Sequence, residues 1–218
     1  MATTMTTTQA GAALRKMRQL GRRQLYVALA VLGLALPSAA MAQGYNYNYV
    51  DAALAIYPDY RVHPAFRGED FIGLRVGGGF QITEEIFGFA NGRYLTDDVD
   101  FLRVSLGGGY RLTMIPLPDE INLDIYAGGA LEMSRFAGDV PSDTTAGASI
   151  RGGVRWHALD NVEVGGELRI VRLNDYVGNH VGLTGRVLYG LANNIHLLGE
   201  LDIEDGEPGI VFGARFSF

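Results

Sequence analysis

The chain has 218 residues, of which 48% are hydrophobic and 19% charged, and its formal net charge at pH 7 is −6. An acidic chain of this kind is poorly suited to nucleic acid, and without any cysteine it has no disulfide to stabilise it. We therefore predict no nucleic-acid partner, and a fold held by hydrogen bonds and packing alone.

The first 42 residues have the three parts of a secretory signal peptide. A basic stretch, Arg15 to Arg23, precedes an apolar run, Leu25 to Leu36, and small residues mark a cleavage site between Ala42 and Gln43. The apolar run is well short of the ~20 residues that a spanning helix needs. Because five of the 18 basic residues and none of the 24 acidic ones lie in this segment, the mature chain carries 13 basic residues against 24 acidic ones, a formal charge of −11.

The rest of the chain, 43–218, is predicted to be one all-β domain. Almost every segment alternates with period two, as strands do, and Gly, Pro and acidic clusters separate the segments. In residues 101–112, for example, Leu102 and Val104 share one face, and Arg103 and Ser105 the other. Ten strands are predicted, at residues 45–57, 70–82, 86–95, 101–113, 121–134, 145–157, 162–173, 180–191, 195–203 and 209–218.

One face of nearly every predicted strand is uncharged, and the other holds Arg, Gly, Ser and scattered acids. The polar face of a secreted β-sandwich meets bulk water and favours Lys, Glu and Thr, whereas arginines among small residues suit a narrow closed interior. Strands of ~9–11 residues also cross a bilayer at their usual tilt. We predict an antiparallel transmembrane β-barrel of ten strands, with eight strands and a β-sandwich as the alternatives.

Aromatic residues near the C-terminal ends of the even-numbered strands lie on the uncharged face. At the ends of alternate strands they would form a girdle at one membrane interface. The predicted girdle comprises Phe80, Tyr110, Trp156, Tyr189 and Phe216.

Both chain ends are expected in the periplasm, so the connections alternate between the two sides of the membrane. The predicted periplasmic turns are 83–85, 114–120, 158–161 and 192–194, and the outer connections are 58–69, 96–100, 135–144, 174–179 and 204–208. The outer connections include the acidic stretches TDDVD and EDGEP, whose carboxylates suit Ca²⁺ or Mg²⁺. They lack EF-hand spacing, and we interpret them as solvated turns without a metal site.

The chain ends GIVFGARFSF, with Phe216 and the terminal Phe218 two positions apart. This ending resembles the signal that outer-membrane proteins present to the barrel-assembly machinery. The stretches YNYNYVDAAL and IFGFANGRYLTDDVDFLRVSLGGGYRL resemble the Ax-type family of xanthomonad relatives, within the OmpA/OmpX-like group of small barrels. The resemblance implies a Gram-negative outer membrane with its lipid and lipopolysaccharide, and it brings no catalytic residues or cofactor. We expect a monomer.

The register of antiparallel hairpins predicts ion pairs inside the barrel. One register across each of three periplasmic turns gives five pairs, Arg103–Glu132, Arg111–Asp124, Arg151–Glu167, Arg155–Glu163 and Arg186–Glu200. Because a barrel of about eight strands is just filled by its side chains, and ten strands add only modest space, we expect a plugged or narrowly hydrated lumen.

These features favour a structural or surface-interaction role for the barrel. A narrow passive channel for small ions or solutes is the alternative, since charged linings also occur in conducting barrels. An enzyme is a third possibility, with His180 and Asp175, or His63, as candidates, but no Ser-His-Asp set or Gly-x-Ser-x-Gly elbow accompanies them. The Gly triplets at 77–79 and 107–109 lack the Lys-Ser/Thr of a phosphate loop. We predict no catalytic, cofactor-binding or metal residues.

Overall fold

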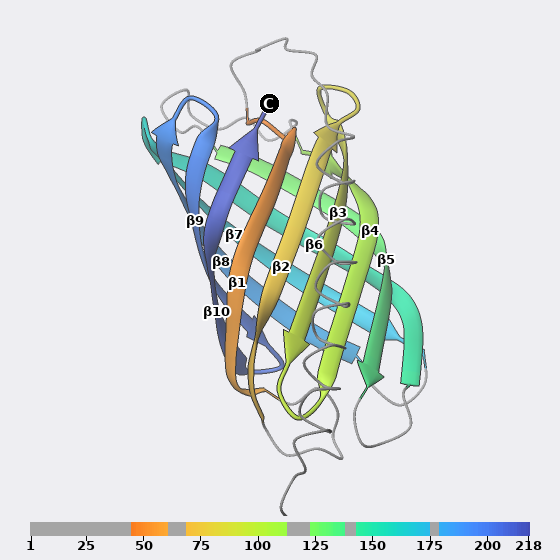
Figure 1. Ribbon diagram of the computed structural model, residues 1–218. Coiled ribbons are helices and arrows are strands. Elements are labelled where there is room, and N and C mark those ends of the chain that lie inside the picture. Colours follow the sequence, from red (N-terminus) through yellow and green to blue (C-terminus); the bar gives the residue numbers. More distant parts are fainter. Residues whose placement is uncertain (1–44, 61–68, 113–122, 138–142, 175–178) are drawn as a thin grey trace, which may run out of the picture. The chain divides into compact units, whose positions relative to one another are not determined.

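The computed structural model describes residues 45–60, 69–112, 123–137, 143–174 and 179–218. In these ranges the regular elements are all β-strands (Figure 1), and none of the described segments is a helix able to cross a membrane. The predicted signal peptide, 1–42, and its cleavage site between Ala42 and Gln43 lie outside the described residues.

Ten antiparallel strands form the domain, and each begins and ends within a few residues of its predicted range. They are β1 (Tyr49–Tyr60), β2 (Glu69–Gln81), β3 (Ile86–Thr96), β4 (Asp100–Arg111), β5 (Leu123–Ala137), β6 (Asp143–Leu159), β7 (Val162–Leu173), β8 (Asn179–Ala192), β9 (Ile195–Glu204) and β10 (Glu207–Ser217).

The sheet closes on itself because β1 pairs with β10 as well as with β2. In the closing ladder Val50 lies opposite Phe216, and Ile56 lies opposite Ile210. Each remaining strand pairs with its neighbours along the chain, so no strand edge is left open. The prediction of a ten-stranded antiparallel barrel is confirmed, and the eight-stranded and sandwich alternatives are wrong.

Alternation along each strand separates a charged lumen from an apolar outer wall. The outward side chains of Leu106, Leu131 and Ile150 are 61%, 72% and 64% exposed. Inward neighbours such as Ser105 and Ser149 are buried. The exposed wall is therefore a continuous apolar surface, far larger than the patches that water-soluble monomers leave open.

Two features at the ends of β1 differ from the prediction. The strand begins at Tyr49 and not at residue 45, because residues 45–48 leave the ladder while Tyr45 and Tyr47 stay buried in the lumen. At its other end a bulge, with Asp59 at φ 52°, shifts the register and lets both Tyr57 and Tyr60 point inward. β1 thus ends at Tyr60, inside the predicted outer loop.

The Gly triplets allow aromatic side chains to lie flat against the inner wall. A Cβ added at Gly107 would come within 2.7 Å of the Phe89 ring, and one at Gly109 would overlap the ring of Phe87. Both triplets lie inside strands, β2 and β4, so they form part of the wall and not a ligand loop.

Candidate functional site: the charged lumen

Charged side chains from all ten strands meet inside the barrel. The described ion pairs of the lumen join nine arginines to eight carboxylates. The arginines are Arg75, Arg93, Arg103, Arg111, Arg151, Arg155, Arg169, Arg186 and Arg215, and the carboxylates are Asp51, Asp124, Glu132, Glu163, Glu167, Glu200, Asp202 and Glu204.

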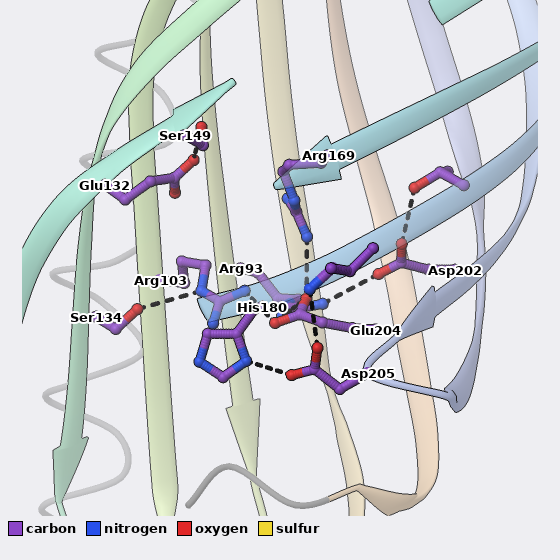
Figure 2. Close-up of polar contacts among 12 residues, drawn as sticks. Arg93, Arg103, Glu132, Ser134, Ser149, Arg169, His180, Asp202, Glu204 and Asp205 are labelled. Carbon is purple, nitrogen blue, oxygen red and sulfur yellow. Dashed lines mark hydrogen bonds and ion pairs between the residues drawn. The ribbon is translucent and has the colours of Figure 1, made fainter. Parts of the chain in front are cut away.

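Glu204 is the most densely paired carboxylate of the lumen (Figure 2). It is 1% exposed and accepts hydrogen bonds from Arg93 at 3.0 Å, from Arg169 at 2.9 Å and from Arg103. These three arginines come from β3, β7 and β4, none of which is a neighbour of β9 in the sheet. The contacts from β3 and β4 therefore join opposite walls of the barrel, and the contact from β7 skips one strand, as ladder pairs cannot.

An aromatic cap adjoins this cluster, at the end of the lumen away from the carboxyl terminus. Arg93 donates hydrogen bonds to the hydroxyls of Tyr57 at 2.7 Å and Tyr60 at 3.1 Å, and its guanidinium lies over both rings. The Tyr60 ring contacts those of Phe71 and Phe101, and Phe101 stacks on Phe136. Charged groups and rings together fill the lumen at this level.

A second arginine cluster lies deeper, around Glu200 and Asp51. Arg75 and Arg186 both bind Glu200, and Arg75 also contacts Asp51 at 3.4 Å. Arg215 completes the cluster, since it donates to Asp51 at 2.8 Å. Each carboxylate is thus shared by two guanidinium groups, which offsets the cost of burying it.

Arg151 faces two carboxylates on the wall formed by β5, β6 and β7. It lies 3.5 Å from Glu132 and 3.5 Å from Glu167. A neutral hydroxyl also binds each acid, because Ser149 donates to Glu132 at 2.6 Å and Tyr126 donates to Glu167 at 2.8 Å.

Residues 45–48 fill the end of the lumen that lies beside the carboxyl terminus. The Tyr47 hydroxyl donates to Asp124 at 2.6 Å, and its ring stacks on Phe87. Arg155 lies over the rings of Tyr45 and Tyr47, with its Cζ atom 5.0 Å and 4.7 Å from their centroids. Burial raises the pKa of the Tyr47 phenol above its usual value near 10, so the hydroxyl stays a donor at neutral pH.

Between the aromatic cap and residues 45–48 lies a cavity of about 100 Å³. Its wall includes Tyr47 and Phe87 on one side and Tyr57 and Arg93 on the other. Because one water needs about 10–15 Å³, the cavity has room for several waters. The lumen is therefore narrowed at both ends, with space for water between them.

Four of the five predicted ion pairs are brought together. The closest nitrogen and oxygen atoms lie 3.0 Å apart in Arg111–Asp124, 2.8 Å in Arg155–Glu163 and 3.5 Å in Arg151–Glu167, and Arg186 also contacts Glu200. The fifth pair, Arg103–Glu132, is wrong. Arg103 reaches across the lumen to Glu204 and donates to Ser134 at 3.2 Å, while Glu132 is bound by Ser149 and Arg151.

The predicted register is correct across one turn and wrong by two residues across two. Arg186 lies directly opposite Glu200, as expected. Arg111 instead lies opposite Tyr126, and Arg155 opposite Gly165. The long arginine side chains still reach the acids diagonally, because such neighbours on one face are only ~7–8 Å apart.

The five predicted girdle residues, Phe80, Tyr110, Trp156, Tyr189 and Phe216, are all exposed on the outer wall near the ends of even-numbered strands. The Phe216 ring stacks with that of Phe218 at a centroid distance of 6.3 Å. The Phe218 amide donates to the Asn48 carbonyl at 3.0 Å, and Asn46 donates to the Phe218 main-chain oxygen at 3.1 Å. These bonds join the segment before β1 to the carboxyl-terminal residue.

Of the enzyme candidates, only His180 lies among the described residues. His180 contacts Asp205 in the β9–β10 turn, and the predicted partner Asp175 and the alternative His63 lie outside the described residues. In the described ranges, no group of three or more His, Asp or Glu residues is arranged to hold a metal ion. Within TDDVD, Asp100 accepts from Tyr94 and Thr96, each at 2.9 Å.

Glu204 is the residue that the sequence interpretation misplaced. As part of EDGEP, Glu204 is predicted from the sequence to lie in a solvated outer loop. In the structure it is the last residue of β9 and is buried in the lumen. The signal was present in the sequence, because Glu200, Asp202 and Glu204 share one strand parity.

No protein-family model matches the chain, and no curated protein matches it. Solved structures do. The KdgM porin is 12% identical over 78% of this chain and 99% of its own, with a TM-score of 0.44. Neisserial surface protein A is 15% identical over 78% and 96%, with a TM-score of 0.41. The translocator domain of the autotransporter NalP from Neisseria meningitidis is 11% identical over 96% and 98%, with a TM-score of 0.47.

Proposed function

We propose that this chain is an outer-membrane β-barrel with a structural or surface-interaction role, and that its lumen is closed to the passage of solutes. The observation that carries the proposal is the binding of Glu204 by three arginines from strands that do not pair with β9. Together with the aromatic cap and the periplasmic tyrosines, these braces occupy the cross-section that a pore would need.

The membrane location is supported by the chemistry of the outer wall. Apolar side chains cover it, and the aromatic residues Tyr110, Trp156 and Tyr189 gather toward one end, as at a membrane–water interface. The proposal includes export by the signal peptide, assembly of a monomer by the barrel-assembly machinery in a Gram-negative cell, and lipid and lipopolysaccharide as its surroundings. Membership of the Ax-type family remains part of the same proposal.

The outer turns are the proposed interaction surface. Asp97 and Asp98 in the β3–β4 turn and Asp205 in the β9–β10 turn are exposed. Because the lumen charges nearly cancel, most of the chain's negative charge lies outside the barrel. Acidic turns on a rigid scaffold suit the recognition of a cationic partner.

A narrow anion-selective channel is the second candidate, favoured by the hydrated, arginine-lined cavity. Conductance separates it from the closed barrel.

Single-cysteine labelling tests the proposed topology, because the natural chain has no cysteine. Asp98→Cys lies in an outer turn and Glu84→Cys in the β2–β3 turn at the other end, and both positions are exposed. In intact cells a membrane-impermeant maleimide should label the first variant, and the second only after the outer membrane is permeabilised. Equal labelling of both in intact cells would reject the location or the orientation.

A further inference from the structure

The cavity in the lumen has an unusual wall. Eight arginine side chains line it, whereas from the described residues only two carboxylates, Glu167 and Asp202, reach its surface. Asp51, Glu200 and Glu204 pair with lining arginines but are not part of the wall. The guanidinium groups therefore face the cavity, and most of their counter-ions lie behind them.

The arginines facing the cavity outnumber the acids that they share. Around Glu200 and Asp51 there are three guanidinium groups for two carboxylates, Arg75, Arg186 and Arg215. Around Glu204 and Asp202 there are again three, Arg93, Arg103 and Arg169.

In one group of residues the carboxylates outnumber the arginines. Arg151 alone serves Glu132 and Glu167, and the hydroxyls of Ser149 and Tyr126 assist it. Among the described ion pairs of the lumen, nine arginines face eight carboxylates, so the arginines of this set are in excess by one.

Hydrogen-bond donors are also left over. Arg186 binds Glu200 through Nε, and within the described part of the chain its two terminal nitrogens have no hydrogen bond. Its side chain is 22% exposed, the most of the ion-paired arginines in the lumen. The Nε atoms of Arg75, Arg169 and Arg215 are buried and have no partner among the described residues. Of these donors, the terminal nitrogens of Arg186 are the ones that an acceptor in the cavity can reach.

We propose that the cavity binds one small oxyanion, such as phosphate, sulfate or a short carboxylate, with Arg186 and Arg169 as its main contacts. The planar guanidinium fork matches the oxygen pairs of such anions, and a wall of low dielectric constant strengthens the attraction. At about 100 Å³ the cavity accommodates an anion with a few waters, but not a sugar or a lipid with its chains. This inference concerns the lumen alone and does not depend on the proposed outer-membrane location.

Calorimetric titration of the full chain, refolded in detergent, tests the site with sodium phosphate and sodium sulfate as probes and sodium chloride as an ionic-strength control. One site is expected for phosphate or sulfate, with weaker binding of chloride. Arg186→Gln should raise the dissociation constant about tenfold, the usual effect of one charge-assisted contact. Arg172→Gln removes the same charge from an exposed position on β7 and should change nothing.

Glu200→Gln gives an independent result of opposite sign. Neutralising this carboxylate removes the counter-charge of Arg75 and Arg186, so the anion should bind more tightly. Circular dichroism establishes whether each variant is folded. If Arg186→Gln does not fold, the anion affinity of Glu200→Gln tests the proposal in its place. The proposal is overturned if the folded wild type binds neither oxyanion, if Arg172→Gln weakens binding as much as Arg186→Gln, or if Glu200→Gln does not strengthen it. The calorimetric result does not depend on whether the barrel conducts ions. The anion site and the closed lumen can therefore be rejected independently of each other.

Discussion

Arg93 and Glu204 are joined by a hydrogen bond of 3.0 Å across the lumen, although 111 residues separate them along the chain. Their strands, β3 and β9, are not neighbours, because β2, β1 and β10 lie between them. The ladder hydrogen bonds join only neighbouring strands, so this bond is an additional contact across the lumen. Its presence, with the bond from Arg103 on β4, makes Glu204 a central brace between opposite walls, and Arg169 on β7 binds the same carboxylate.

Replacing Glu204 should therefore destabilise the barrel. Glu204→Ala leaves three buried guanidinium groups without their shared partner, and we expect the free energy of unfolding to fall by about 3–5 kcal/mol. Asp98→Ala removes an exposed carboxylate from the β3–β4 turn and should change it by no more than about 0.5 kcal/mol. Urea unfolding in lipid vesicles, followed by tryptophan fluorescence, measures both. Equal midpoints for the two variants would show that Glu204 is not a brace.

Tyr47 gives a pH-dependent prediction. Burial raises the pKa of its phenol in the folded barrel, whereas the unfolded chain releases this proton at about pH 10. Above about pH 10 the folded state holds the proton that the unfolded state has lost, so stability falls as the pH rises. Tyr47→Phe should lose less stability between neutral pH and this alkaline range than the wild type does. Parallel losses in urea titrations at the two pH values would contradict a buried Tyr47.

Trp156 reports the depth of the girdle, because it is the only tryptophan of the chain. It is 47% exposed on the outer wall, near the end of β6. Lipids brominated close to the headgroup should quench its fluorescence more than lipids brominated at the chain ends. The double variant Trp156→Phe, Leu131→Trp, with its indole at mid-strand, should show the reverse order. The same quenching order for both proteins would exclude an interfacial girdle.

The terminal phenylalanine gives a prediction about assembly. If Phe218 is part of the signal for the assembly machinery, Phe218→Ala should lower the amount of barrel in the outer membrane of cells. Unassisted refolding in detergent should be nearly unchanged, since the machinery is absent there. Phe212→Ala, at an exposed position inside β10, is the control and should assemble normally. Loss of unassisted refolding in Phe218→Ala alone would indicate a structural role instead.

Strand parity explains why so much of the fold was predictable. An outward Leu102 or Val104 and an inward Arg103 cannot exchange faces without exposing charge to an apolar environment, so the alternation defines each strand. The number of strands and the closure by β10 follow from repeating this pattern. The bulge before Tyr60 was not predictable, because it depends on the backbone of Asp59.

The pairing inside the lumen was less predictable. Hairpin register depends on turn geometry, so a two-residue error moved Asp124 from a position opposite Arg111 to a diagonal one. That pair survived because arginine is long. Contacts between non-adjacent strands leave no local signal in the sequence. The hairpin register therefore predicts a pair between Arg103 and Glu132, whereas Arg103 binds Glu204. Tyr45 and Tyr47 resemble strand residues in the sequence, because they continue the inward alternation of β1 although they lie before its first ladder pair.

Single-channel recording in planar bilayers tests the closed lumen most directly. The wild-type barrel, refolded and inserted, should show no stable unitary conductance, because the Glu204 brace, the outer aromatic cap and Tyr47 fill the cross-section. A general porin inserted into the same bilayer is the positive control, and quenching of Trp156 by brominated lipid establishes insertion. Reproducible unitary current steps from the wild-type barrel would contradict the closed lumen and favour the narrow channel.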